Sequence, residues 1–175
     1  MPRSEKPIRF SATLGKLSET SGWHYLPVSK TVADRFGFTG NSRRVVCTLN
    51  GAETFQCGLM PMDGDYFIMV NKSIRQKLGI EPGHSVKVEL FKDESKYGLP
   101  MPEEFREILD QDPEGDRLFH ALTPGKQRNI LYYVGKVKDI DKRIHVGLIF
   151  IEHLKDNQGK IIHEKLAEEL KRPIF

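Results

Sequence analysis

The stretch VNKSIRQKLGIEPGHSVKVEL, residues 70–90, decides the fold of this chain. Its pattern predicts a strand end, a short helix closed by Gly79, a turn at EPG and a strand of alternating apolar residues. A rougher copy, VSKTVADRFGFTGNSRRVVCTL, begins 42 residues earlier at Val28. One such unit would leave an apolar strand face uncovered, so we expect the two copies to pack together about a pseudo-twofold axis as a small β-barrel.

Alternating apolar residues predict further strands around the repeat. Residues 8–14 and 23–28 give two strands before the first copy's helix. Residues 44–49 and 54–59 are predicted to form a hairpin across Asn50-Gly51, a pair typical of two-residue turns.

The chain has only two cysteines, one in each strand of this hairpin. A two-residue turn places Cys47 opposite Thr54 and Cys57 opposite Arg44. Because successive side chains alternate between the faces of a sheet, the two thiols are expected to point to opposite faces. We therefore expect no disulfide, in agreement with a reducing compartment.

The character of the sequence changes after the repeat. The polar, proline-rich stretch KDESKYGLPMP, residues 92–102, predicts a linker, and Thr123-Pro124 is typical of a helix start. One later helix is expected to pack through four apolar residues at helical spacing: Ile140, Ile144, Leu148 and Ile151. We predict an α+β protein with a pseudo-symmetric double-split (AbrB-like) β-barrel in residues 1–97 and a helical segment in residues 98–175.

Composition and charge describe an ordinary globular protein. The chain has 175 residues and a net charge of +3, a surplus too small to indicate nucleic-acid binding by itself. The first ten residues lack the apolar core of a signal peptide, and the longest apolar run, residues 146–151, is too short to span a bilayer. We expect a cytoplasmic protein without membrane insertion.

The second copy carries a motif of known proteins. Its matching residues are Ile74-Arg75, Leu78-Gly79-Ile80, Gly83 and residues 86–89. They resemble the motif IRxxLGIxxGDxVxVE of the AbrB/MazE-like swapped-hairpin DNA-binding families. Asn71 stands where those families usually have proline, and His84 stands where they have aspartate. Those families build the barrel from two chains, whereas this chain would hold both halves.

Five other stretches carry a second resemblance: RVVCTLNG (44–51), GDYFIMVNKSIRQKLGI (64–80), KDESKYGLPMPEE (92–104), FHALTPGKQR (119–128) and KRI (142–144). Over nearly its whole length, the chain resembles a bacterial family of unknown function. That family joins a double-split β-barrel domain to a segment labelled YdeI/OmpD-associated, sometimes called bacteriocin-protection. Related sequences carry a Lys and, after it, a run of an acidic residue, Thr, Arg, any residue and Arg. Lys136, Asp139 and Arg143 match this run, but Asp141 replaces its first Arg.

Basic side chains in or beside the repeat are candidates for nucleic-acid binding: Arg43, Arg44, Lys72, Arg75 and Lys77. The AbrB-like resemblance implies that such arginines reach phosphates and grooves. Binding of this kind releases counterions and depends steeply on salt. The alternative is that Lys72, Arg75 and Lys77 form the solvated face of a short helix.

A second candidate site, for a small anion, lies around LTPGKQR, residues 122–128. Lysine and arginine beside a helix N-terminus suit an anion. With the matching residues of the family run, the candidates are His120, Lys126, Arg128, Lys136 and Arg143. The alternative is a well-capped helix start with solvated charges.

No motif for catalysis or metal binding is recognisable. There is no Gly-x-Ser-x-Gly elbow, and HEKLA, residues 163–167, has Ala167 where a zinc motif requires a second histidine. An enzyme would need Cys47 or a histidine beside a carboxylate. We expect a non-enzymatic protein, with no catalytic residue, metal or cofactor, that binds nucleic acid or, alternatively, a small anionic ligand or peptide at the barrel–helix junction.

Overall fold

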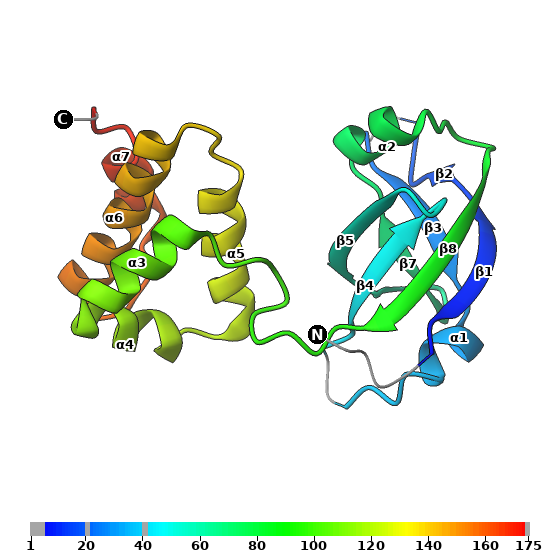
Figure 1. Cartoon of the computed structure of the whole chain (residues 1–175), viewed down its shortest axis with the longest axis horizontal. Coiled ribbons are helices and arrows are strands. Elements are labelled where there is room, and N and C mark those ends of the chain that lie inside the picture. The colour runs from blue at the N-terminus through cyan, green and yellow to red at the C-terminus, as the bar shows by residue number, and fades with distance from the viewer. Residues whose placement is uncertain (1–5, 20–21, 40–41, 174–175) are drawn as a thin grey trace. The chain divides into compact units, whose positions relative to one another are not determined.

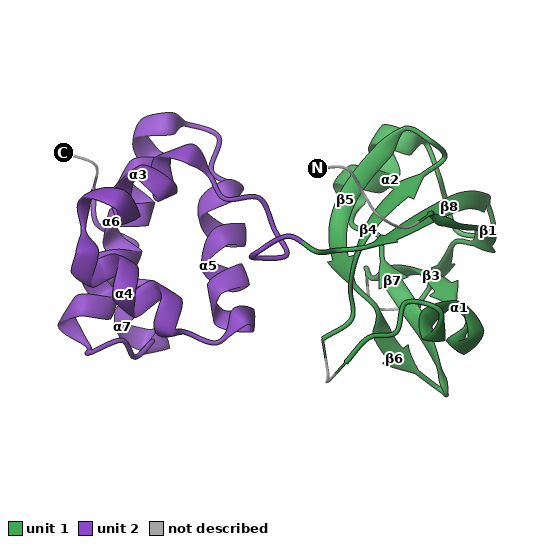
Figure 2. Cartoon of the chain, turned by 60° about the horizontal axis from the view of Figure 1, so that its bottom comes forward, with its two compact units in different colours: residues 1–94 green, residues 95–175 purple. Residues whose placement is uncertain are grey.

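The computed structural model of the chain describes residues 6–19, 22–39 and 42–173. The chain divides into two compact units, residues 1–94 and residues 95–175 (Figure 2). The sequence placed this boundary after residue 97. The first unit contains all the strands assigned in the described residues, and the second unit contains helices only (Figure 1). The predicted α+β class is therefore confirmed.

The described residues of the first unit form two four-stranded antiparallel sheets and two short helices. The order in the first sheet is β1 (Ile8–Thr13), β8 (Ser85–Lys92), β4 (Arg44–Leu49) and β5 (Glu53–Gly58). The order in the second sheet is β2 (Gly15–Lys16), β3 (His24–Val28), β7 (Asp65–Met69) and β6 (Met60–Met62). The helices are α1 (Lys30–Asp34) and α2 (Lys72–Leu78).

The sequence repeat is visible in the strand pairing. The first copy supplies β3, α1 and β4, and the second copy supplies β7, α2 and β8. At the centre of one sheet β3 pairs with β7, and at the centre of the other β4 pairs with β8. Equivalent strands thus meet in both sheets, as a pseudo-twofold relationship requires. The pairings make two sheets, and none in the described part of the chain closes them into one barrel. The resemblance of the first unit to the AbrB-like barrel therefore stays a prediction.

Both repeat helices start with the side-chain caps that their sequences suggest. The Ser29 hydroxyl accepts a hydrogen bond from the Val32 N–H at 3.2 Å, and the Asn71 amide oxygen accepts one from the Ile74 N–H at 2.9 Å. Gly79 ends α2 in the left-handed conformation, with φ of 63°. Each cap satisfies backbone groups that the helix itself leaves unpaired.

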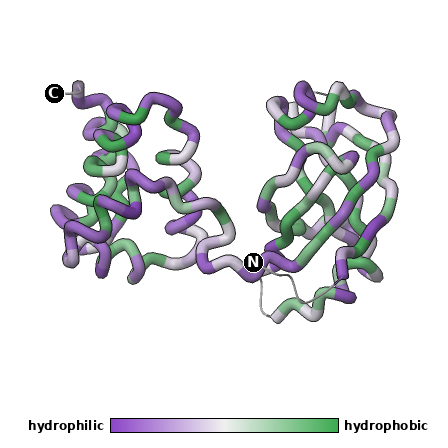
Figure 3. The backbone as a smooth tube through the Cα atoms, viewed as in Figure 1, coloured by the Kyte–Doolittle hydropathy of each residue, from purple (hydrophilic) through white to green (hydrophobic). Residues whose placement is uncertain are grey.

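Alternation of buried and more exposed residues along β4 and most of β8 builds much of the core of this unit, and Figure 3 shows hydrophobic and hydrophilic residues mixed along its strands. Val45, Cys47 and Leu49 of β4 are fully buried, while the residues between them are partly exposed. The inward residues of β8 are buried in the same way. The two sheets therefore share one apolar core, to which β3 and β7 contribute Val28 and Ile68.

The β4–β5 hairpin differs from the sequence prediction by one residue. Cys47 pairs with Phe55 rather than Thr54, because Ala52 joins Asn50 and Gly51 in the connection. A shift of one residue turns every side chain of a strand to the other face. Cys47 and Cys57 therefore share one face, and the prediction that they point apart is wrong.

The second unit consists of five helices in its described residues: α3 (Glu103–Gln111), α4 (Pro113–Ala121), α5 (Pro124–Gly135), α6 (Ile140–Asp156) and α7 (His163–Glu169). The long helix α6 contacts each of the other four. Phe105, Phe119 and Leu131 are among the fully buried side chains of this unit's own core. Among the described residues, no helix combines the length and the apolar character needed to cross a membrane.

Helix α6 does not pack through the face that its sequence pattern suggested. Ile140, Ile144 and Leu148 are 59%, 36% and 43% exposed, and only Ile151 of the predicted set is buried. The buried face instead includes Gly147. A Cβ atom there would lie only 2.8 Å from Ile108 Cδ1, so the glycine lets α3 approach α6 closely. The helix offers two apolar stripes, and the one with the glycine is packed.

Candidate functional site

A hollow of about 390 Å³ lies in the second unit, between the segment before α3 and the last turns of α5. Its volume lies within the range of small-molecule sites. Apolar residues dominate a lining that also includes two cations: Leu99, Pro100, Pro102, Leu131, Tyr132, Gly135, Lys136 and Arg143. The structure thus brings together Lys136 and Arg143, two of the five residues predicted to bind an anion.

Arg143 is held in place from two sides. Its Nε donates a hydrogen bond to the Val137 carbonyl at 2.8 Å, and its Nη1 lies 3.2 and 3.3 Å from the two carboxylate oxygens of Glu104. A backbone hydrogen bond at Glu104 itself, together with the Arg143 guanidinium, lowers the pKa of the Glu104 carboxyl. Arg143 is therefore a fixed cation whose charge Glu104 partly balances.

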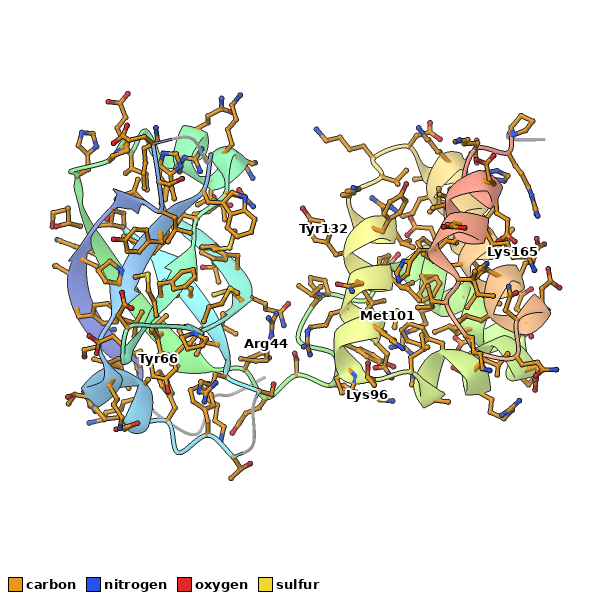
Figure 4. The ribbon with its side chains drawn as sticks, turned by 180° about the vertical axis from the view of Figure 1, so that it is seen from behind. Arg44, Tyr66, Lys96, Met101, Tyr132 and Lys165 are labelled. Atoms are coloured by element: carbon orange, nitrogen blue, oxygen red, sulfur yellow. The ribbon has the colours of Figure 1, made fainter. Side chains whose placement is uncertain are left out.

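Of the two cations at the hollow, Lys136 has fewer interaction partners than Arg143. It follows the last residue of α5, and its ammonium lies 4.5 Å from the ring centroid of Tyr133 and 5.7 Å from that of Tyr132. No carboxylate in the described parts of the chain pairs with it. Tyr132 projects from α5 and is 61% exposed (Figure 4). An aromatic face attracts a cation without neutralising its charge, so Lys136 keeps its attraction for an anion.

The other three predicted anion-binding residues lie elsewhere in this unit. Lys126 and Arg128 belong to the start of α5, and ten residues of helix separate Lys126 from Lys136 by about 15 Å. His120 of α4 is engaged by Tyr97, whose hydroxyl lies 2.7 Å from its Nε2, and by Asp116, whose Oδ1 lies 3.0 Å from its Nδ1. The loop LTPGKQR is thus a capped helix start, distant from the hollow.

Comparison with known families agrees with this division. Residues 10–90 match a family described as a domain of unknown function (DUF1905), and residues 99–156 match a family described as bacteriocin-protection, YdeI or OmpD-associated. We call the two segments similar to these families the DUF1905 domain and the YdeI/OmpD-associated segment. This is the composition that the sequence resemblance predicted. No curated protein matches the chain.

In the DUF1905 domain, the five basic residues predicted to bind nucleic acid fall into two groups. Arg43 and Arg44 stand at the start of β4. The other three are on α2, where Lys77 Nζ lies 3.5 Å from a carboxylate oxygen of Glu53, beyond the far end of β4. A strand of six residues spans roughly 20 Å, so the two groups occupy opposite ends of the sheet.

The two groups also differ in their contacts. The Arg43 guanidinium lies 5.0 Å from the ring centroid of Tyr66, and Lys92 lies 5.9 Å from that of Phe38 (Figure 4 labels the neighbouring Arg44 and Tyr66). On α2, Arg75 Nη1 donates a hydrogen bond of 2.6 Å to the Val70 carbonyl and so fixes the helix to its preceding strand. The start of β4 is therefore a basic and aromatic cluster, whereas α2 uses one of its cations structurally.

Sequence reasoning missed the walls of the hollow. Leu99, Pro100 and Pro102 were assigned to a linker because their stretch is polar and rich in proline. Their apolar side chains form a surface only when α5 lies beside them, a tertiary relationship without a local signal. The helical spacing of Leu131 and Gly135 offered the one available hint, since residues four apart share a helix face.

Proposed function

We propose that the YdeI/OmpD-associated segment is a binding module for a small organic anion, without chemical conversion of that ligand and without a cofactor. One observation carries the proposal. Lys136, which has no carboxylate partner in the described residues, stands beside Arg143 at a hollow whose other walls are mainly apolar. Such a lining suits a ligand with an apolar body and one anionic end.

The two ends of such a ligand would meet different walls. Its apolar body would cover Leu99, Pro100 and Leu131, and gain the free energy of removing apolar surface from water. Its anionic group would reach Lys136 and the Nη2 donors of Arg143, because Nε and Nη1 already bind Val137 and Glu104. At about 0.3 kcal/mol per non-hydrogen atom, a ligand of roughly 14 such atoms would bind with a Kd on the order of 1 mM.

The test is titration with naphthalene-2-sulfonate and naphthalene-2-carboxylate, followed by NMR chemical shifts at fixed salt. We expect binding to the full chain, with Lys136→Ala weakening it about tenfold. Gly135→Leu would block the hollow, because a Cβ at Gly135 lies 3.7 Å from Pro102 Cγ and a longer side chain must extend into the space. Lys126→Ala is the matched control, since it removes the same charge from the other end of α5.

Two results would contradict this proposal. Equal loss of binding in Lys136→Ala and Lys126→Ala would indicate general charge attraction instead of a site. Unchanged binding in Gly135→Leu would place the ligand outside the hollow. Titration with naphthalene itself separates the contribution of the apolar body to binding from that of the anionic group, because naphthalene has the same apolar body without the anion.

A second candidate function, nucleic-acid binding or regulation by the DUF1905 domain, is favoured by the cluster at the start of β4. Arg43 stacks on Tyr66 beside Arg44, and cations with aromatic faces suit phosphates and unstacked bases. Fluorescence anisotropy with labelled duplex and single-stranded DNA, at low and moderate salt, tests it. We expect salt-sensitive binding that Arg43→Ala/Arg44→Ala abolishes and Lys72→Ala/Lys77→Ala preserves. Absence of binding at low salt would exclude it.

The proposal places the protein in the cytoplasm. The two cysteines of the DUF1905 domain are free thiols, although they share one face of a hairpin. A reducing compartment would keep two such neighbouring thiols reduced. Fractionation of cells that express the tagged full chain tests this location.

A further inference from the structure

The one-residue shift in the β4–β5 hairpin brings the two cysteines of the chain together. Cys57 is directly opposite Val45, and Cys47 is directly opposite Phe55. Val45 and Cys47 both point into the core, because they are two residues apart on one strand. Cys57 is therefore the diagonal neighbour of Cys47 on the inner face of the sheet.

The two thiols are neighbours in the sheet but differ in burial. Their side chains start from diagonally adjacent positions on the same face of the hairpin. Cys47 has no exposed surface, whereas Cys57 is partly exposed and packs at the margin of the core. One thiol of the pair can therefore meet a small molecule from solvent, and the other is held beside it.

We propose that Cys47 and Cys57 are a reversible redox pair, which a peroxide converts to an intradomain disulfide. In the first step the Cys57 thiolate attacks one peroxide oxygen. The S–O bond forms, the O–O bond breaks, and hydroxide leaves as water after taking a proton. In the second step Cys47 sulfur attacks Cys57 sulfur. The S–S bond forms, the S–O bond breaks, and the departing hydroxide takes the Cys47 proton. Two thiols and one hydrogen peroxide thus give one disulfide and two waters.

The environment assigns different roles to the two residues. The hydrogen bond to Cys57, with burial as the next cause, raises the pKa of the Cys47 thiol. Cys47 is accordingly a poor first nucleophile, since the thiolate is the reactive form. Cys57 is the residue that the oxidant reaches, and Cys47 is the resolving residue, which lies beside it on the same face of the hairpin.

The strand geometry favours a bond that is easily reduced. Diagonal neighbours on antiparallel strands are typically about 7–8 Å apart, whereas a disulfide holds its Cα atoms at about 4.4–6.8 Å. The hairpin must therefore twist further to form the bond. Strain of this kind raises the reduction potential, and strained disulfides belong to the labile class.

The test treats the reduced full chain with limiting hydrogen peroxide, alkylates the remaining thiols and maps the fragments by mass spectrometry. Both cysteines lie in one tryptic fragment, residues 45–72, and cleavage after Glu53 separates them. We expect two fragments joined by a link that dithiothreitol breaks. Oxidised methionines in the fragment add mass without producing such a link. Two alkylated cysteines, or a Cys57 sulfinic acid without a link, would overturn the proposal.

Single substitutions test the roles of the two residues. In Cys57→Ser, Cys47 should stay alkylatable after peroxide treatment, because the thiol that the oxidant reaches is absent. In Cys47→Ser, Cys57 should proceed to sulfinic acid, since no resolving thiol is present. Oxidation of Cys47 at the same rate in Cys57→Ser would contradict the assignment. If either variant fails to fold, the fragment map of the unaltered chain still decides the proposal.

Discussion

His153 Nδ1 lies 2.8 Å from Glu169 Oε2, so a histidine that is only 1% exposed joins α6 to α7. Its other nitrogen, Nε2, accepts a hydrogen bond of 3.0 Å from the Ile162 N–H. Nε2 can accept only when it carries no proton, which places the proton of a neutral ring on Nδ1, where it is donated to Glu169. The His153 side chain thus binds both a side chain of α7 and a backbone N–H of the turn before α7.

We predict that His153→Ala destabilises the helical segment by about 3 kcal/mol, because it leaves a cavity and two polar groups without partners. Circular dichroism at the helix band during urea unfolding measures this loss. Trp23, the only tryptophan of the chain, lies in the DUF1905 domain and reports on that domain separately. Its transition should not move, and a shift of both transitions would contradict the local role of His153.

Gly147 and Gly135 should respond in opposite ways to alanine. A Cβ at Gly147 would lie 2.8 Å from Ile108 Cδ1 and 3.2 Å from Phe105 Cδ2, whereas a Cβ at Gly135 meets nothing closer than 3.7 Å. Alanine favours a helix over glycine by about 1 kcal/mol, and crowding a packed core costs about 1–3 kcal/mol. We expect Gly147→Ala to lower the helical unfolding midpoint and Gly135→Ala to raise it. Two shifts of the same sign would contradict the packing of α3 on α6.

The fold was predictable where local signals and tertiary packing agree. Ser29 and Asn71 are good N-caps next to short apolar patterns, and Gly79 supplies a left-handed cap, so the repeat could be located to within a few residues. The pairing of β3 with β7 and of β4 with β8 follows from the repeat, because neither copy alone covers its apolar face.

The errors arose where the local sequence is compatible with two arrangements. Helix α6 has two apolar stripes. Which stripe packs in the core depends on Gly147, because its missing side chain matters only once α3 lies against α6. In the hairpin, Asn50-Gly51 suits a two-residue turn, yet the inclusion of Ala52 turns Phe55 and Cys57 toward the core. Within the candidate site, Lys136 and Arg143 were predicted from the family run. The apolar walls of the hollow could be recognised only from the tertiary structure.

Asp112 links acid stability to the packing of α4 on α6. Its Oδ1 accepts from the Gly115 N–H at 2.9 Å, and its Oδ2 lies 2.7 Å from Lys155 Nζ. The hydrogen bond from Lys155, followed by that from Gly115, lowers the pKa of the Asp112 carboxyl. A carboxyl with a lowered folded pKa stabilises the fold above its unfolded pKa of about 3.9, and this contribution is lost as the pH falls through the folded value.

We therefore predict that Asp112→Asn costs about 0.5 kcal/mol at pH 7, since it keeps the helix cap but removes the partly exposed ion pair. The difference from the unaltered chain should shrink as the pH falls below about 4, because the Asp112 carboxyl then takes up a proton in the unfolded chain first and, at lower pH, in the folded chain as well. Urea midpoints measured by circular dichroism from pH 7 to pH 3 check this. A difference that is constant over this range would show that the ion pair with Lys155 does not contribute to stability. Lys155→Met should reproduce the effect of Asp112→Asn.

The register of β5 gives the last prediction. Deletion of Ala52 would leave Asn50-Gly51 as a two-residue turn between Leu49 and Glu53, so the pairs of Leu49 with Glu53 and of Cys47 with Phe55 would be kept. Phe55 and Cys57 would still face the core, and the tryptophan-monitored unfolding midpoint should change little. Deletion of Thr54, inside β5, would instead turn Phe55 and Cys57 outward and Gln56 toward the core. Burying a polar side chain without a partner and exposing an aromatic ring costs about 3 kcal/mol or more, so the midpoint should fall sharply. Equal losses in the two deletion variants would contradict this register.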